Sequence, residues 1–310
     1  MFRAHISHYW PHFIAAAAAI LLPIMLVGGY LSHPPNWGTG NIQDKEKIAA
    51  AVYDIAYGLS ADRAPLPAFP SGESQVTDAA GAGKVVPILM YHHIGDYKGP
   101  KPKDAYLYTP ADTFREETGW LASHGYHTIT LPELFSGYIP ANPIVLTFDD
   151  GYQDNYDNAY KILREKGQKG TFFVISGFVG GGYLSNTEVK EMSNGGMDIE
   201  SHTVSHPELA KLSPASLTEQ LMKSKQVLED LTGKKVDFLA YPFGNYNDSI
   251  KNATKAAGYK AAVTVSPLSK NESMYELPRI EAIPRDRGNS LGNKIAGYIK
   301  ANGGFAWKYR

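Results

Sequence analysis

Cysteine is absent from this chain of 310 residues. Disulfide bonds, thiolate metal ligands, a cysteine nucleophile and a lipid-modified cysteine anchor are therefore excluded. The chain also lacks an excess of either charge, because 30 Lys and Arg residues face 31 Asp and Glu residues. Without a net field of one sign we expect no nucleic-acid partner. What is present, 43% hydrophobic and 20% charged residues, is typical of a globular protein with a sizeable core.

A long uncharged run lies near the start of the chain. Residues 13–31 read FIAAAAAILLPIMLVGGYL and are close to the ~20 residues that cross a bilayer as a helix. Arg3 precedes the run and the next lysine is Lys45, so the positive-inside rule places the remainder outside the cell membrane. We predict a single-pass transmembrane anchor over residues 1–34. A cleaved signal peptide, which would give a secreted protein, is the alternative.

The rest of the chain divides into two parts by composition. Residues 35–84 contain an amphipathic helical pattern, read as a stalk, and a linker rich in proline, glycine and alanine. Residues 85–310 contain eight apolar strand-like runs, many of them separated by helical patterns. Such alternation predicts an α/β domain with a parallel sheet, either open or closed into a barrel, and chemistry at the carboxyl ends of its strands.

Polar or turn-forming residues close four of these strand-like runs. They are His92 after VVPILMY, Asp149 and Asp150 after PIVLTF, His202 after DIES with His206 four residues later, and YPFG at 241–244 after DFLA. Because the carboxyl ends of parallel strands share one rim, we expect these residues to lie close together.

The pattern His-x-x-x-His in SHTVSHP, residues 201–207, can direct two imidazoles at one metal ion. With one carboxylate of the Asp149–Asp150 pair it makes three ligands and leaves positions for water and substrate, as a catalytic metal requires. The other carboxylate can then accept the proton of the water. Two loop histidines and a pair of helix-capping aspartates are the alternative without chemistry.

TFDDGY and SHTVSHP resemble the first two motifs of the polysaccharide deacetylase family, the NodB-homology family of carbohydrate esterases, over roughly residues 85–285. The resemblance implies a distorted (β/α) barrel and metal-dependent removal of N-acetyl, or sometimes O-acetyl, groups from a sugar polymer. It also implies roles for five positions. Asp149 matches the catalytic base, Asp150, His202 and His206 match the metal ligands, and YPFG matches a third motif whose backbone N–H, near Phe243, holds the oxyanion.

The chain departs from the family pattern at three places. Ala240 stands where the third motif usually has an arginine, the later Asp-x-x-Asp-Trp motif is not present, and no histidine follows His206 to supply the catalytic acid. ILMYHHI, residues 88–94, resembles the circularly permuted branch of biofilm and cell-envelope deacetylases, in which the acid-bearing strand comes first. Neighbouring side chains of a strand face opposite ways, so we expect His92 to be the acid and His93 to face loop or solvent. A histidine that merely caps a buried strand is the alternative.

A late arginine can replace the missing one and orient the base. Arg279 in LPRIEAI is the first candidate, and Arg285 and Arg287 are its rivals.

Several aromatic and polar residues are candidates for contact with a sugar. Tyr152, Tyr156 and Tyr160 recur at helical spacing, which favours packing, although Tyr152 lies near enough to the rim to stack on a sugar. Asn245 and Tyr246 follow YPFG and can line the groove.

We therefore predict a monomeric metal-dependent hydrolase, with residues 85–310 as its catalytic domain, that removes N-acetyl groups from an extracellular or cell-wall glycan of the poly-N-acetylglucosamine type. The expected metal is zinc, with cobalt, nickel or iron as alternatives. An O-acetyl esterase of xylan-like polymers and a non-catalytic glycan-binding envelope protein are the alternative functions.

Overall fold

The computed structural model describes residues 86–99, 102–137, 139–268, 273–284 and 286–301, all of which belong to one compact unit. The predicted anchor at 1–34 and the predicted stalk and linker at 35–84 lie outside these ranges. Among the residues that are described, no helix combines the length and apolar character needed to cross a bilayer.

Each of the eight apolar runs contains a strand, and two short strands join them. The strands are β1 (Ile88–Tyr91), β2 (His93–Ile94), β3 (Tyr108–Thr109), β4 (His127–Ile129), β5 (Pro143–Phe148), β6 (Thr171–Val174), β7 (Asp198–Ser201), β8 (Phe238–Ala240), β9 (Ala261–Val263) and β10 (Ile280–Glu281). The main sheet has the order β10-β1-β5-β6-β7-β8-β9, with β4 also paired to β5, while β2 pairs with β3. Every pairing is parallel.

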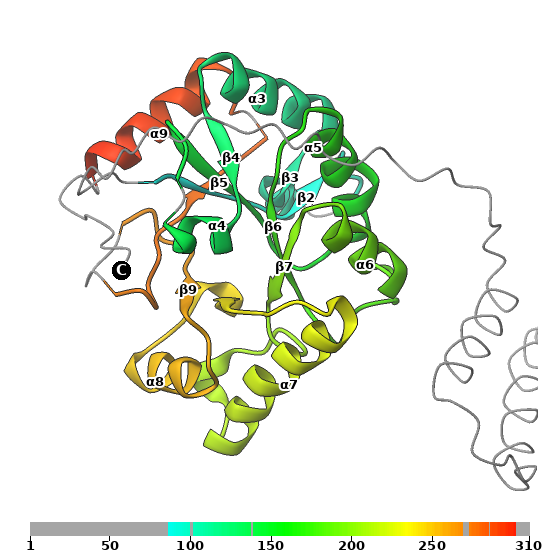
Figure 1. Cartoon of the computed structure of the whole chain (residues 1–310), viewed down its shortest axis with the longest axis vertical. Coiled ribbons are helices and arrows are strands. Elements are labelled where there is room, and N and C mark those ends of the chain that lie inside the picture. Colours follow the sequence, from blue (N-terminus) through cyan, green and yellow to red (C-terminus); the bar gives the residue numbers. More distant parts are fainter. Residues whose placement is uncertain (1–85, 100–101, 138, 269–272, 285, 302–310) are drawn as a thin grey trace, which may run out of the picture. The chain divides into compact units, whose positions relative to one another are not determined.

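Helices surround the sheet. They are α3 (Ala111–Ser123), α4 (Leu131–Ser136), α5 (Lys161–Glu165), α6 (Asn186–Asn194), α7 (Pro214–Thr232), α8 (Asp248–Ala256) and α9 (Asn289–Ala301), with shorter turns η1 (Pro102–Leu107), η2 (Asn155–Tyr160, π-helical), η3 (Leu209–Lys211) and η4 (Pro242–Gly244). The parallel strands curl into a half-barrel, and α9, α3, α5, α6, α7 and α8 follow one another around its outside (Figure 1). Helix α3 begins at Ala111, with Pro110 as its N-cap.

Alternation along the strands divides the core in two. One cluster lines the inner face of the curved sheet and includes Ile88, Val145, Phe173 and Val263, whereas their sequence neighbours pack under the helices. Helix α4 closes the amino end of this interior, because Phe135 contacts Phe238, the first residue of β8, with 4.8 Å between ring centroids. The carboxyl end remains for a binding site.

The segment that leads into β10 connects the two ends of the sheet. Its Leu277 exchanges backbone hydrogen bonds with β9, donating to Ala262 O at 2.9 Å, and Ala282 donates to Met90 O of β1 at 3.0 Å. Arg279 lies between these two contacts and is fully buried. The topology therefore brings this late arginine into the interior beneath the strand ends.

Gly177 lets the loop after β7 approach β6. Its N–H donates to Val204 O at 2.8 Å, and a Cβ at this position would lie 2.5 Å from the same oxygen. That separation is shorter than van der Waals contact allows, so any larger residue displaces the loop that connects His202 and His206.

We expect Gly177→Ala to lower the free energy of unfolding by about 1–3 kcal/mol, because it overpacks a close backbone contact. Urea titration measures this loss. Gly181→Ala is the matched control, since a Cβ there meets nothing closer than 3.6 Å. Equal stability of the two variants would contradict the prediction.

Candidate active site

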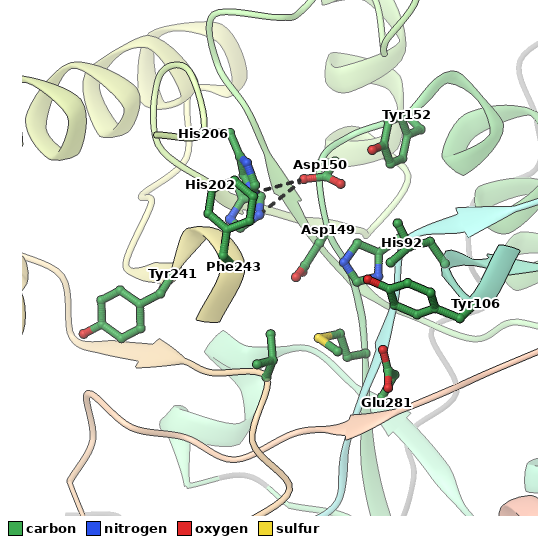
Figure 2. A pocket seen from close by; sticks show the side chains of 13 residues that line it. His92, Tyr106, Asp149, Asp150, Tyr152, His202, His206, Tyr241, Phe243 and Glu281 are labelled. Carbon is green, nitrogen blue, oxygen red and sulfur yellow. Dashed lines mark ion pairs between the residues drawn. The ribbon is translucent and has the colours of Figure 1, made fainter. Parts of the chain in front are cut away.

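A pocket of about 480 Å³ lies at the carboxyl ends of the strands (Figure 2). Seven residues that the sequence singles out contribute to its lining, namely His92, Asp149, Asp150, Tyr152, His202, His206 and Phe243. They come from the ends of β1, β5 and β7 and from η4 after β8. The structure therefore gathers the predicted residues at one rim.

Asp150, His202 and His206 form a group that can hold a metal ion. One ligand atom from each lies within 4.8 Å of the others. Asp150 Oδ1 is 3.3 Å from His202 Nε2 and 3.7 Å from His206 Nε2. Two imidazoles and a carboxylate suit zinc and similar divalent metals, and three protein ligands leave coordination positions for other groups. The donor set therefore fits a catalytic metal.

The imidazoles are prepared for this role in different ways. His202 Nδ1 lies 2.8 Å from Ala240 O, an oxygen that only accepts, so Nδ1 carries the hydrogen and Nε2 is directed to the metal position. Burial alone would lower the pKa of His202, but the neighbouring Asp150 and Asp149 carboxylates outweigh it and raise the pKa. Burial, reinforced by His202, lowers the pKa of His206 to about 4, which keeps that ring neutral.

Left-handed backbone conformations concentrate at this site. Of the described non-glycine residues with positive φ, four belong to it: Asp150 at 76°, Thr203 at 69°, His206 at 54° and Phe243 at 58°. Each costs roughly 1–3 kcal/mol, and such strain persists where the surrounding structure enforces it, commonly at functional sites. At Asp150 the turn directs adjacent carboxylates to different partners.

Arg279 holds the second carboxylate of the pair, Asp149. Its Nη1 and Nη2 donate to Asp149 Oδ1 and Oδ2, both at 2.7 Å. The guanidinium is itself fixed by Thr264 O at 2.7 Å and Thr147 Oγ1 at 3.1 Å. Burial by itself would raise the pKa of Asp149, but Arg279 outweighs this and holds the pKa below its usual value. Asp149 is thus ionised and oriented.

Of the rival arginines, Arg287 is not placed beside Asp149. Arg287 is exposed and pairs with Glu116 at 3.1 Å and Thr113 Oγ1 at 2.8 Å, whereas Arg285 lies outside the described residues.

His92 follows β1 and lies across the pocket from the three metal-binding candidates (Figure 2). Burial lowers its pKa, although Asp149 and Asp150 partly oppose this. His93 does not line the pocket, as predicted, but it faces the segment after β5 rather than solvent. Its ring stacks on Tyr108 and Tyr152, with centroids 3.9 and 3.5 Å away, and its Nδ1 lies 2.8 Å from Asp154 Oδ2.

Tyr152 lines the pocket but has no free ring face for a sugar. His93 stacks on it at 3.5 Å and Tyr183 at 5.2 Å between centroids. Two rings at these distances would overlap if they shared one face, so they cover opposite faces. Tyr156 and Tyr160 are buried and stack on each other at 5.4 Å, as the packing interpretation expects.

The residues around YPFG divide between pocket and core. Phe243 is 56% exposed, and its ring centroid lies 4.5 Å from that of His206. Its N–H has no hydrogen-bond partner in the described structure. Asn245 and Tyr246 are not among the lining residues. Tyr246 stacks instead on Tyr241 at 5.2 Å, so a role for these two in the groove stays a prediction.

Sequence reasoning missed two polar members of the lining, Tyr106 and Glu281. Tyr106 comes from η1 and is 51% exposed, and no motif marks it. Glu281 is paired in register with Met90, beside His92. The alternation of LPRIEAI places Glu281 on the same side as Arg279, which is the signal that could have identified it.

Comparison with known proteins agrees with this site. A family model for polysaccharide deacetylase matches residues 137–262, a range that begins after His92. "Putative polysaccharide deacetylase YxkH" of Bacillus subtilis is 35% identical over 218 residues, which are 68% of this chain and 76% of that protein. The poly-beta-1,6-N-acetyl-D-glucosamine N-deacetylase of Staphylococcus aureus strain N315 is 31% identical over 188 residues, 54% of this chain and 65% of that protein.

A solved structure shares the fold. The Streptococcus pyogenes deacetylase PplD, in complex with acetate, superimposes with a TM-score of 0.65 and 30% sequence identity, covering 68% of this chain and 99% of that chain.

Replacing Arg279 with glutamine should lower the free energy of unfolding by about 3–5 kcal/mol, because Asp149 is left as an uncompensated buried charge. Arg287→Gln, the matched control at an exposed ion pair, should cost about 0–1 kcal/mol. Urea unfolding at neutral pH measures both, and similar losses would contradict the assignment.

The pH dependence of this loss has a definite sign. The pKa of Asp149 is depressed in the folded protein, so its stabilisation is present above the unfolded pKa of about 4 and disappears as pH falls through the lower folded value. The difference between wild type and Arg279→Gln should therefore shrink in acid.

Proposed function

This chain belongs to the polysaccharide deacetylase family, and we propose that it is a metal-dependent N-deacetylase of a glycan of the poly-N-acetylglucosamine type. One observation carries the proposal: a candidate metal triad, an arginine-held carboxylate and a partly buried histidine share one pocket. Acetate, the product expected from deacetylation, is present in the solved Streptococcus pyogenes relative.

Zinc is the proposed metal, held by Asp150, His202 and His206. When bound, a divalent metal supplies Lewis-acid polarisation of the acetyl carbonyl and a lowered pKa for a coordinated water. The protein supplies the ligands at fixed positions, and the Ala240 carbonyl sets the orientation of His202.

The neighbouring side chains divide the proton transfers. Asp149, kept ionised by Arg279, accepts a proton from the attacking water. The backbone N–H of Phe243 donates to the oxyanion as negative charge develops. His92 donates a proton to the departing nitrogen, which is a poor leaving group until it is protonated. The amide is thus cleaved to acetate and a free amine.

The residues that line the pocket favour a glycan substrate that carries no acidic groups. Tyr106 and Phe243 are 51% and 56% exposed where they line the pocket, and aromatic faces of this kind suit the apolar faces of sugar rings. No lysine or arginine is found among the described residues that line it, whereas Glu281 is. The Staphylococcus aureus relative is named for poly-β-1,6-N-acetylglucosamine, an uncharged polymer before deacetylation.

The proposal extends to cellular location and chain order. A polymer substrate of this kind lies outside the cell, which agrees with an anchor at 1–34 and an exported, monomeric catalytic domain at 85–310. Since the family match begins after His92, we propose that the acid-bearing strand is displaced to the front, as in the permuted branch.

Acetate release from poly-N-acetylglucosamine oligomers should require metal. Dialysis against a strong chelator should abolish release, and stoichiometric zinc or cobalt should restore it, because three protein ligands cannot polarise the amide alone. Asp150→Asn and His206→Ala should bind zinc more weakly in a chelator competition. Undiminished acetate release from the metal-free protein would overturn the proposal.

His92→Ala should discriminate between leaving groups. Cleavage of the amide should fall by about 100-fold or more, because general-acid catalysis is lost. Hydrolysis of an aryl acetate, whose leaving group departs without protonation, should change little. Because burial lowers the pKa of His92 below its ordinary value of about 6.5, wild-type amide cleavage should also decline as pH rises from acid toward neutrality while aryl acetate hydrolysis persists. Equal losses on both substrates would assign His92 another role.

A further inference from the structure

The proposed acid, His92, is not oriented by a partner on its ring. Within the described residues its imidazole makes no hydrogen bond, although it is partly buried in the pocket. Histidines that transfer protons are usually oriented by a carboxylate or carbonyl on the second nitrogen. The position of the His92 ring must therefore come from packing and from its own backbone.

That backbone is held by side chains that follow the Asp149–Asp150 pair. Asn155 Nδ2 donates to His92 O at 2.7 Å. Asn158 Nδ2 donates to Ile94 O at 2.6 Å, and Ile94 N donates to Asp154 Oδ1 at 3.3 Å. Asn155 is fully buried. Three side chains within five residues thus bind the carbonyls of His92 and Ile94 and the amide of Ile94.

Asp154 also fixes the side chain of His93. The 2.8 Å contact between His93 Nδ1 and Asp154 Oδ2 has the form of a catalytic histidine–aspartate pair. His93 does not line the pocket, however, and Tyr108 and Tyr152 stack on its ring. The pair consequently serves as an anchor for the residue beside the acid.

The local helix geometry presents these groups together. Asn155 and Asn158 both lie in η2, and both side chains contact the backbone of residues 92–94. η2 is a π-helical turn, a rare geometry that is frequent at functional sites. It follows directly on the turn that carries Asp149 and Asp150.

We propose that Asn155, with Asp154 and Asn158, is a positioning residue that sets the place of His92 relative to the base and the metal. These three residues are called the clamp. The inference rests on the proposed role of His92 as general acid. In this arrangement one segment, 149–158, carries the base, one metal ligand and the support of the acid.

The first test compares Asn155→Ala with Asp157→Ala. Asp157 lies in the same turn but is exposed and pairs with Lys161 at 3.3 Å, which makes it a matched control. Asn155→Ala should lower kcat for amide cleavage about 10- to 100-fold, since misplacement by about 1 Å costs a factor of this size. Its KM, zinc affinity and aryl acetate hydrolysis should stay within about twofold of wild type, and Asp157→Ala should match wild type throughout.

A double variant separates positioning from general damage. If Asn155 acts through His92, then His92→Ala/Asn155→Ala should cleave the amide no more slowly than His92→Ala alone. A further loss as large as in the wild-type background, or a parallel loss on aryl acetate, would overturn the proposal. Should Asn155→Ala fail to fold, Asn158→Ala, at a half-buried position, carries the same comparison.

A measurement without substrate keeps this inference distinct from the proposed function. In the zinc-loaded full chain, an NMR titration of the His92 imidazole should give a pKa that differs from that of wild type in Asn155→Ala but not in Asp157→Ala. Absence of wild-type acetate release would refute the substrate assignment alone. An unchanged His92 titration in Asn155→Ala would refute the clamp.

Discussion

The site depends on keeping two adjacent buried carboxylates ionised at the end of one strand. Each needs its own source of positive charge, because unpaired buried ions are strongly disfavoured. Arg279 satisfies both oxygens of Asp149, and Asp150 faces His202 and His206, with which it forms a group that could hold a metal cation. The left-handed turn at Asp150 separates these partners, so one carboxylate is directed to the arginine and the other to the candidate metal site. The remaining features of the rim support that separation.

The strained backbone conformations are concentrated at the strand ends that line the pocket. The left-handed residues Asp150, His206 and Phe243 come from three different strand ends, and each turns toward the same pocket. Their strain requires compensation from well-packed surroundings, which the fully buried strands provide. Gly177 belongs to this support because it admits the loop that carries His206. The packing of the apolar half-barrel therefore offsets the backbone strain at the polar rim.

The strands and the rim residues could be predicted because their signals are local. β-branched and apolar runs mark β5 and β6. The Asp-Asp pattern directly follows β5, and the His-x-x-x-His pattern directly follows β7. Arg279 was the first candidate in the sequence but could not be separated firmly from Arg285 and Arg287, because the hydrogen bonds between β9, β10 and β1 are what place it beneath Asp149. The stacking of His93 between Tyr108 and Tyr152 could not be predicted either, because these rings come from distant segments. Tyr106 lacked any signal, and the proximity of Asn245 and Tyr246 to YPFG in the chain did not bring them into the lining.

The placement of the proposed acid, His92, and the proposed base, Asp149, follows from strand register rather than chain order. In the parallel pair of β1 and β5, Tyr91 is the partner of Phe148, and Asp149 N donates to Tyr91 O at 2.9 Å. The next residues, His92 and Asp149, are therefore neighbours across the two strand ends. Any strand that occupied the β1 position in the sheet could deliver a histidine there, whatever its place along the chain. A domain of this kind can begin with the acid-bearing strand without altering its proton transfers, provided that side chains such as Asn155 hold that strand end in place.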